Sequence, residues 1–319
     1  MRSLFALLLV LLALAAPARA QEDEIVANLA GGRVIIHVTR DAILFAAIDH
    51  PLEATSVPPR VAEIDRSHVA VFFGASEWQL PAAPKPIRLD RDIEHILPAD
   101  KRYQVVGAAD ADLEQIGVIF LEKLRPLASQ LHHKIDLKPD EPLLQIVLIG
   151  YAPNAYGPEV WLIEYRLEQN QPGAQADYLQ THVLRPRFTQ LYPPEKHEPR
   201  TIVELRFPED LQEIPLAGLI QQNDQRIVRL RAADPKFAKV MDLIQRGQAN
   251  KADTQDSADF LRAALPLLAG NAHFLQATLS EDSGFHWVVP PEEPVDKSPK
   301  TRDKDHPPDA PTLRRKPNP

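Results

Sequence analysis

The segment that decides the fold runs from Gly31 to Ala47 and reads GGRVIIHVTRDAILFAA. Its residues 33–38 are rich in β-branched side chains and follow two glycines, which predicts a strand. A polar turn at residues 39–41 leads into a second run, 42–48, in which almost every side chain is apolar. The pattern therefore predicts a β-hairpin whose second strand is buried.

Two further pairs of strands follow the same logic. Residues 60–65 and 68–73 are apolar runs that flank a short polar turn. Residues 142–150 form a continuous apolar run, and residues 159–165 alternate between apolar and polar side chains after a turn-rich linker. We expect each pair to be an antiparallel hairpin.

Helical periodicity separates these hairpins. A long helix is predicted to begin at Asp110 or Asp112, with Pro126 as a point of kinking or division. Its apolar side chains recur at helical spacing: Leu113, Ile116, Phe120, Leu121, Leu124, Leu127 and Leu131. This stripe faces either the core of the domain or a partner subunit, and a core-facing role is the commoner one for an amphipathic helix.

The C-terminal half repeats the alternation of strands and helices. A β-rich region is expected at 181–207, helices at 234–248 and 255–269, and a last strand pair at 273–280 and 285–289. Antiparallel pairs with helices between them indicate an α+β fold rather than a doubly wound α/β sheet.

The N-terminus has the three parts of a bacterial secretory signal peptide. Arg2 supplies the positive charge, residues 4–16 are apolar, and Ala18-Arg19-Ala20 gives the small residues that signal peptidase requires. The apolar run is shorter than the roughly 20 residues of a membrane-spanning helix. We therefore expect cleavage before Gln21, with no stable membrane span afterwards, and a periplasmic or extracellular location.

These signals divide the chain into four parts. Residues 1–20 are the signal peptide, 21–30 a short extension, and 31–289 a single domain with a loop-rich insertion near 76–108. Residues 290–319 are rich in proline and charge and carry few apolar side chains, which predicts a disordered tail.

Composition narrows the possible partners. The chain contains no cysteine, so disulfides cannot contribute to its stability. Its net charge is −8 with no basic stripe, which argues against nucleic acid as a partner because phosphate contacts supply that affinity. The pattern shows no phosphate loop, dinucleotide fingerprint or metal motif, so we expect no cofactor and no metal.

The order of these hairpins and helices resembles that of the proteasome subunit family, within the N-terminal-nucleophile (Ntn) hydrolase fold. The likeness lies in Gly31–Ala47, in Arg60–Ala75, and in Leu144–Tyr151 followed by Gly157–Tyr165. These stretches are similar to three hairpins of the family. The resemblance implies a four-layer αββα sandwich, in which two antiparallel sheets lie between helical layers.

The resemblance also implies where a catalytic site would lie. In the family, a Thr, Ser or Cys stands first in the mature chain and its own α-amine serves as the base. That position falls on Gly31, which has no side chain, while the family's acid falls near Ile48 or Asp49 and its Lys falls on Arg60. Arginine keeps the charge but does not release a proton as lysine can. The family's chemistry is thus expected to be absent.

Other residues offer weaker candidates for chemistry. Asp49-His50 lies near Thr55-Ser56 and could form a base and a nucleophile, although all are ordinary turn residues beside prolines. Thr39 is a third hydroxyl candidate. The adjacent His132-His133 lacks the spacing of metal ligands on one helix face.

Two functions remain open at this stage. One is an exported, catalytically inactive Ntn-type protein that acts as a binding or assembly module in the cell envelope, as a homo-oligomer or with a protein partner. The other is an exported peptidase or amidohydrolase of the same fold that uses an unrecognised Ser or Thr nucleophile.

Overall fold

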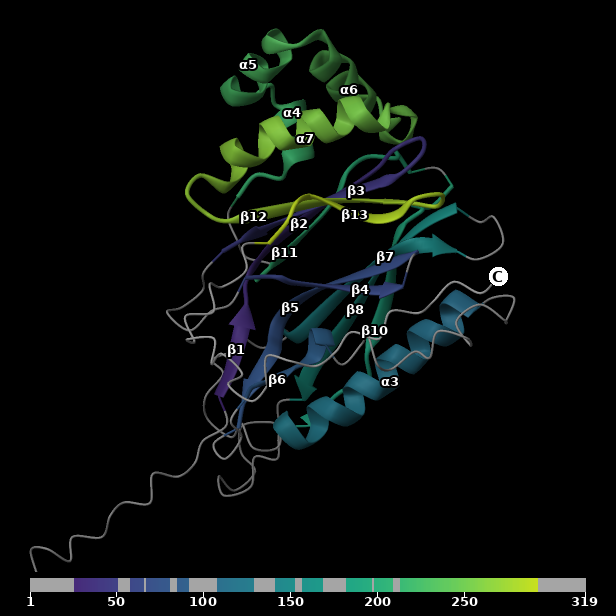
Figure 1. Ribbon diagram of the computed structural model, residues 1–319, viewed down its shortest axis with the longest axis vertical. Coiled ribbons are helices and arrows are strands. Elements are labelled where there is room, and N and C mark those ends of the chain that lie inside the picture. Colours follow the sequence, from purple (N-terminus) through teal and green to yellow (C-terminus); the bar gives the residue numbers. More distant parts are fainter. Residues whose placement is uncertain are drawn as a thin grey trace, which may run out of the picture.

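The computed structural model describes residues 26–50, 58–65, 67–80, 85–91, 108–128, 141–152, 157–168, 182–196, 198–208 and 213–291. Within these residues the chain forms two antiparallel sheets with helices on their outer faces (Figure 1). The predicted α+β class is therefore confirmed. No helix among the described residues is long and apolar enough to cross a membrane.

The larger sheet holds eight strands within the described part of the chain, with the central order β1-β5-β7-β8-β10. Its strands are β1 (Val26–Ala30), β4 (Arg60–Asp65), β5 (His68–Gln79), β6 (Ile87–Arg88), β7 (Pro142–Ala152), β8 (Gly157–Glu168), β9 (His182–Val183) and β10 (Arg187–Tyr192). β4 and β1 pair with successive parts of β5, so they follow one another along the same edge of the sheet.

The smaller sheet has the order β11-β2-β3-β12-β13 across its five described strands. They are β2 (Gly32–Val38), β3 (Ile43–Asp49), β11 (Val203–Phe207), β12 (Phe274–Ser280) and β13 (Gly284–Val289). β3 lies at the centre, paired with β2 on one side and with β12 on the other.

The helices lie on the outer faces of the two sheets. They are α3 (Ala108–Ala128), α4 (Leu216–Gln221), α5 (Gln225–Ala233), α6 (Pro235–Gln245) and α7 (Thr254–Ala269), with a short 3-10 turn, η1 (Ala249–Lys251). α3 lies beside the larger sheet, and α4 to α7 gather beside the smaller one (Figure 1). Asp224, Asp234 and Asp253 begin α5, α6 and α7 by accepting hydrogen bonds from the first backbone amides.

Three separate apolar cores explain why the central strands are so uniformly apolar. Phe45 of β3 packs between the two sheets, whereas its neighbour Leu44 packs against the helices. In β5, Phe73 lies between the sheets and Phe72 packs with α3. Since successive side chains of a strand point to opposite faces, a strand buried on both faces loses its alternation of polar and apolar residues.

The four predicted strand pairs are confirmed as β2/β3, β4/β5, β7/β8 and β12/β13. The structure differs in the segment expected to be a loop-rich insertion from residue 76, because β5 continues as a paired strand to Gln79. Trp78 of this segment is fully buried and donates its indole N–H to the Ala75 carbonyl at 2.8 Å. The apolar ring then packs in the core beneath α3.

Several elements were not predicted, and β1, α4 and α5 are the longest of them. β1 lies in the presumed N-terminal extension, and it pairs with β5 from Val26 to Ala30. α4 and α5 precede the predicted helix at 234–248 and cover the smaller sheet. The signal peptide and the tail beyond residue 291 lie outside the described residues.

Candidate functional site

Gly31 and Gly32 lie where the chain passes from the larger sheet to the smaller one. β1 ends at Ala30 and β2 begins at Gly32, so residue 31 lies between two paired strands. Its carbonyl accepts a hydrogen bond from the His50 amide at 3.1 Å. Gly32 has φ +151°, and a Cβ there would lie 2.2 Å from the Ile48 carbonyl oxygen. The backbone at this point leaves no room for a side chain at position 32.

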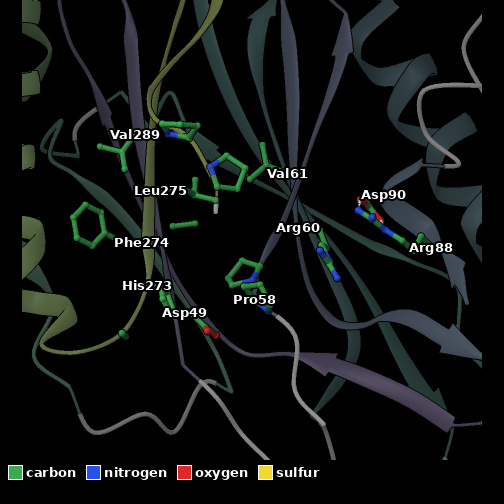
Figure 2. Close-up of a pocket in the computed structure, with 15 residues that line it drawn as sticks. Asp49, Pro58, Arg60, Val61, Arg88, Asp90, His273, Phe274, Leu275 and Val289 are labelled. Carbon is green, nitrogen blue, oxygen red and sulfur yellow. Dashed lines mark hydrogen bonds and ion pairs between the residues drawn. The ribbon is translucent and has the colours of Figure 1, made fainter. Parts of the chain in front are cut away.

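A cavity of about 510 Å³ opens near this crossing, between the two sheets (Figure 2). The end of β3 and the start of β12 form one wall, and the start of β4 with β6 forms the other. The lining is Ala47, Asp49, Pro58, Pro59, Arg60, Val61, Arg88, Asp90, Ala272, His273, Phe274, Leu275, Val289, Pro290 and Pro291. It is thus a mainly apolar cavity with a few charged groups.

Asp49 is the acidic group on the β3 wall. Burial raises the pKa of its carboxyl group, and the nearby charges of His273 and His50 act in the opposite direction. Its backbone amide donates to the His273 carbonyl at 2.9 Å, which fixes the end of β3 against the start of β12. Its Oδ1 is buried and accepts no hydrogen bond from the described residues. This oxygen can therefore accept a hydrogen bond from a further donor.

Arg60 and Arg88 are the cations of the opposite wall, and each is held by a carboxylate. Arg60 Nη2 donates to Glu77 Oε2 at 3.0 Å, and Glu77 Oε1 also accepts from Asn28 of β1 at 3.0 Å. Arg88 Nε donates to Asp90 Oδ1 at 3.1 Å. Figure 2 shows both arginines on the side away from Asp49. Their positive charge is therefore largely offset within that wall.

A second, much smaller cavity of about 40 Å³ lies on the other side of Asp49 and borders Arg33. Arg33 is 4% exposed, and its guanidinium contacts Glu213 at 3.1 Å, Glu204 at 3.6 Å and the Leu268 carbonyl at 2.7 Å. Glu204 in turn accepts the backbone amide of Leu216, the first residue of α4, at 2.8 Å. We call these groups the Arg33 cluster, and it ties the smaller sheet to α4 and α7.

His37 is a third buried ionisable group of the smaller sheet. It is fully buried, and its Nε2 lies 3.2 Å from the Ala249 carbonyl of η1. Desolvation lowers its pKa to about 4, against a smaller opposite effect of that carbonyl. The ring is therefore neutral at physiological pH and acts in packing.

The structure brings together two of the three positions that the family resemblance implied. Asp49 and Arg60 line the same cavity, while Gly31 lies in the crossing between β1 and β2. Sequence reasoning missed His273, which is separated from Asp49 by more than two hundred residues and reaches it through the β3–β12 pairing. No spacing rule within the sequence could signal that contact.

The remaining candidates do not form a catalytic group in the described residues. Thr39 is buried at the far end of β2, where its hydroxyl donates to the Ala42 carbonyl at 2.7 Å and contacts Thr254 at 2.8 Å. It shapes the β2–β3 turn. Thr55, Ser56 and the pair His132-His133 lie outside the described residues.

The described cavity lining contains no serine or threonine, and the sequence contains no cysteine. Among the residues that the structure describes, no group of three or more His, Asp or Glu side chains could hold a metal ion. The described lining therefore offers apolar surface and charged groups, and it carries no hydroxyl or thiol side chain. No protein-family model matches the chain, and no curated protein matches it either.

Proposed function

We propose that this chain is an exported Ntn-type protein that does not cleave peptides and acts as a binding or assembly module in the cell envelope. The observation that carries the proposal is the position of Gly31 within a continuous backbone between two paired strands. A nucleophile of this type needs both a reactive side chain and a free α-amine at the same residue. Residue 31 has neither while β1 remains joined to it.

The proposed fold is the four-layer αββα sandwich of the proteasome subunit family. The separate cores between α3 and the larger sheet, between the two sheets, and between the smaller sheet and α4 to α7 support this arrangement. The cavity supports a binding role, because it combines apolar walls with a few convergent polar groups.

The alternative is an exported hydrolase of the same fold that uses a different hydroxyl. The engagement of the Thr39 hydroxyl in its turn weighs against that residue as a nucleophile. Thr55 and Ser56 keep the alternative open, because their chain segment follows Asp49 and His50 directly.

The first experiment determines the N-terminus of the mature protein. The full chain is expressed with its own leader, recovered from the periplasm or medium, and examined by N-terminal sequencing and intact mass. We expect a terminus at Gln21 and no further processing, and a variant lacking residues 1–20 should stay in the cytoplasm. A terminus at a Ser or Thr would overturn the proposal in favour of the hydrolase.

The second experiment uses covalent probes for serine and threonine hydrolases on the same material. We expect no labelling of the native protein. Labelling that disappears in Thr55→Ala or Ser56→Ala would overturn the proposal and identify the nucleophile.

A further inference from the structure

We propose that the cavity between the sheets binds a protonated primary amine attached to an apolar body, with the ammonium group at Asp49. This inference rests on the proposed binding function and names the chemistry of its ligand. The ammonium group can belong to a small organic amine or to the amino terminus of a peptide, and both sources share the same recognition chemistry.

The distribution of charge around the cavity favours a cation. On the far wall, Arg60 is paired with Glu77 and Arg88 is paired with Asp90. On the near wall, no arginine or lysine of the described residues forms an ion pair with Asp49, and the charges close to it are those of His273 and His50. The negative charge of Asp49 is therefore the least compensated charge of the lining.

The hydrogen-bonding state of Asp49 points the same way. Asp49 lines the cavity, and its buried Oδ1 accepts no hydrogen bond from the described residues. Ionised carboxylates are acceptors only, so the group that would satisfy this oxygen is a donor. An ammonium group offers three donors and the opposite charge, and charge-assisted hydrogen bonds of this kind are the strong ones.

The walls beyond Asp49 suit an apolar body. Phe274 and Leu275 of β12 and Val289 of β13 line the side next to Asp49, and Val61 of β4 lines the other. At about 510 Å³ the cavity lies within the roughly 300–1,000 Å³ of small-molecule sites. It accommodates a small amine or the first residues of a peptide, whereas a folded domain is too large to enter.

The test measures binding to the mature protein by isothermal titration calorimetry. The probes are n-hexylamine, the peptide Leu-Phe-amide with a free amino terminus, and the same peptide acetylated at that terminus. We expect at least one of the two amines to bind, and the acetylated peptide to bind at least about tenfold more weakly than the free peptide because it lacks the charge. Hexylamine binding alone indicates a small-molecule ligand, and peptide binding with no hexylamine binding indicates a peptide terminus.

Two variants tie binding to the cavity. Asp49→Asn keeps the shape and removes the charge, and it should weaken amine binding by about tenfold to a hundredfold. Asp41→Asn is the matched control, because Asp41 is exposed and lies at the opposite end of β3. Ala272→Leu fills the cavity from its border and should weaken binding without altering charge. Far-UV circular dichroism establishes that each variant is folded.

Two outcomes would overturn the inference. One is the absence of binding of either amine to the folded native protein, and the other is equal binding to native protein and Asp49→Asn. Neither result changes the N-terminal sequencing that tests the proposed function, so failure of the ligand assignment and failure of the binding-module proposal are distinguishable.

Discussion

Arg33 and Asp49 lie on neighbouring strands at the same end of the smaller sheet, yet their surroundings differ. Arg33 faces the helices, where two carboxylates and a carbonyl oxygen contact its guanidinium group. Asp49 faces the space between the sheets, where one carboxylate oxygen is buried and accepts no hydrogen bond from the described residues. The comparison separates a charge that links a strand to the helices from a charge that has no such partner and to which we assign a ligand.

Removal of the Arg33 charge is expected to have the largest effect. Arg33→Met leaves Glu204, which is 5% exposed, without its cation, and a broken buried ion pair destabilises by roughly 3–5 kcal/mol. Urea unfolding followed by circular dichroism measures the change. Arg40→Met is the control, since Arg40 is 63% exposed and a surface change should stay within about 0.5 kcal/mol. If Arg33→Met lowered the free energy of unfolding by less than about 1 kcal/mol, Arg33 would not differ from Asp49 in its contribution to stability.

Lowering the pH should reduce the free energy of unfolding because His37 is buried in its neutral form. In the unfolded chain its pKa returns to about 6.5, whereas in the folded protein burial holds the pKa at about 4. Between these values the unfolded state binds the additional proton, so stability is complete above pH 6.5 and falls as pH is lowered towards 4. The loss amounts to about 3 kcal/mol. It is measured as the difference between native protein and His37→Gln in urea unfolding across this range, and parallel curves would contradict the assignment.

The glycine beside Arg33 should tolerate no side chain. Gly32→Ala places a Cβ against the Ile48 carbonyl, and we expect a loss of about 2 kcal/mol or more in the free energy of unfolding. Gly157→Ala is the matched control, because Gly157 also has a positive φ, at +88°, but no atom lies within 4 Å of an added Cβ. Equal losses in the two variants would show that backbone conformation alone matters at Gly32.

Asp49→Asn should have the smallest effect on stability. The raised pKa of Asp49 means that the folded state favours the protonated carboxyl group, so this group's contribution to stability is lost as pH rises from the ordinary value of 3.8 through the raised pKa. Replacement by neutral asparagine should leave the free energy of unfolding at pH 7 within about 1 kcal/mol of the native value, in the stabilising direction. A clear destabilisation would place Asp49 with Arg33 among the structural charges.

Local patterns were enough to predict the strands at the centre of the sheets. Runs such as residues 42–48 and 142–150 are so apolar that both of their faces are expected to be buried. Pairing within hairpins also followed from the sequence, because each turn joins adjacent strands.

Elements whose stability comes from tertiary packing were missed. β1 is a short segment without a distinct strand pattern, and its strand conformation depends on its pairing with β5. α5 is so rich in charged residues that its apolar stripe is hard to detect. The second half of β5 was missed because Ser76, Glu77 and Gln79 interrupt its apolar pattern.

The site was only partly predictable for the same reason. Asp49 and Arg60 were singled out through the family resemblance, and hairpin geometry gave their approximate positions. The ion pair between Arg60 and Glu77, and the approach of His273 to Asp49, depend on strand pairings and side-chain positions that local spacing does not encode.

The pairing of β1 with β5 has an evolutionary consequence. For residue 31 to act through its own α-amine, the chain would have to acquire a hydroxyl or thiol there and also be cut after Ala30. The cut would release a strand whose last residue is fully buried. Each change alone brings no catalytic advantage, and the second one weakens the sheet. Under the proposed Ntn-type fold, the pairing of β1 with β5 therefore opposes the stepwise gain of a self-processing mechanism at residue 31.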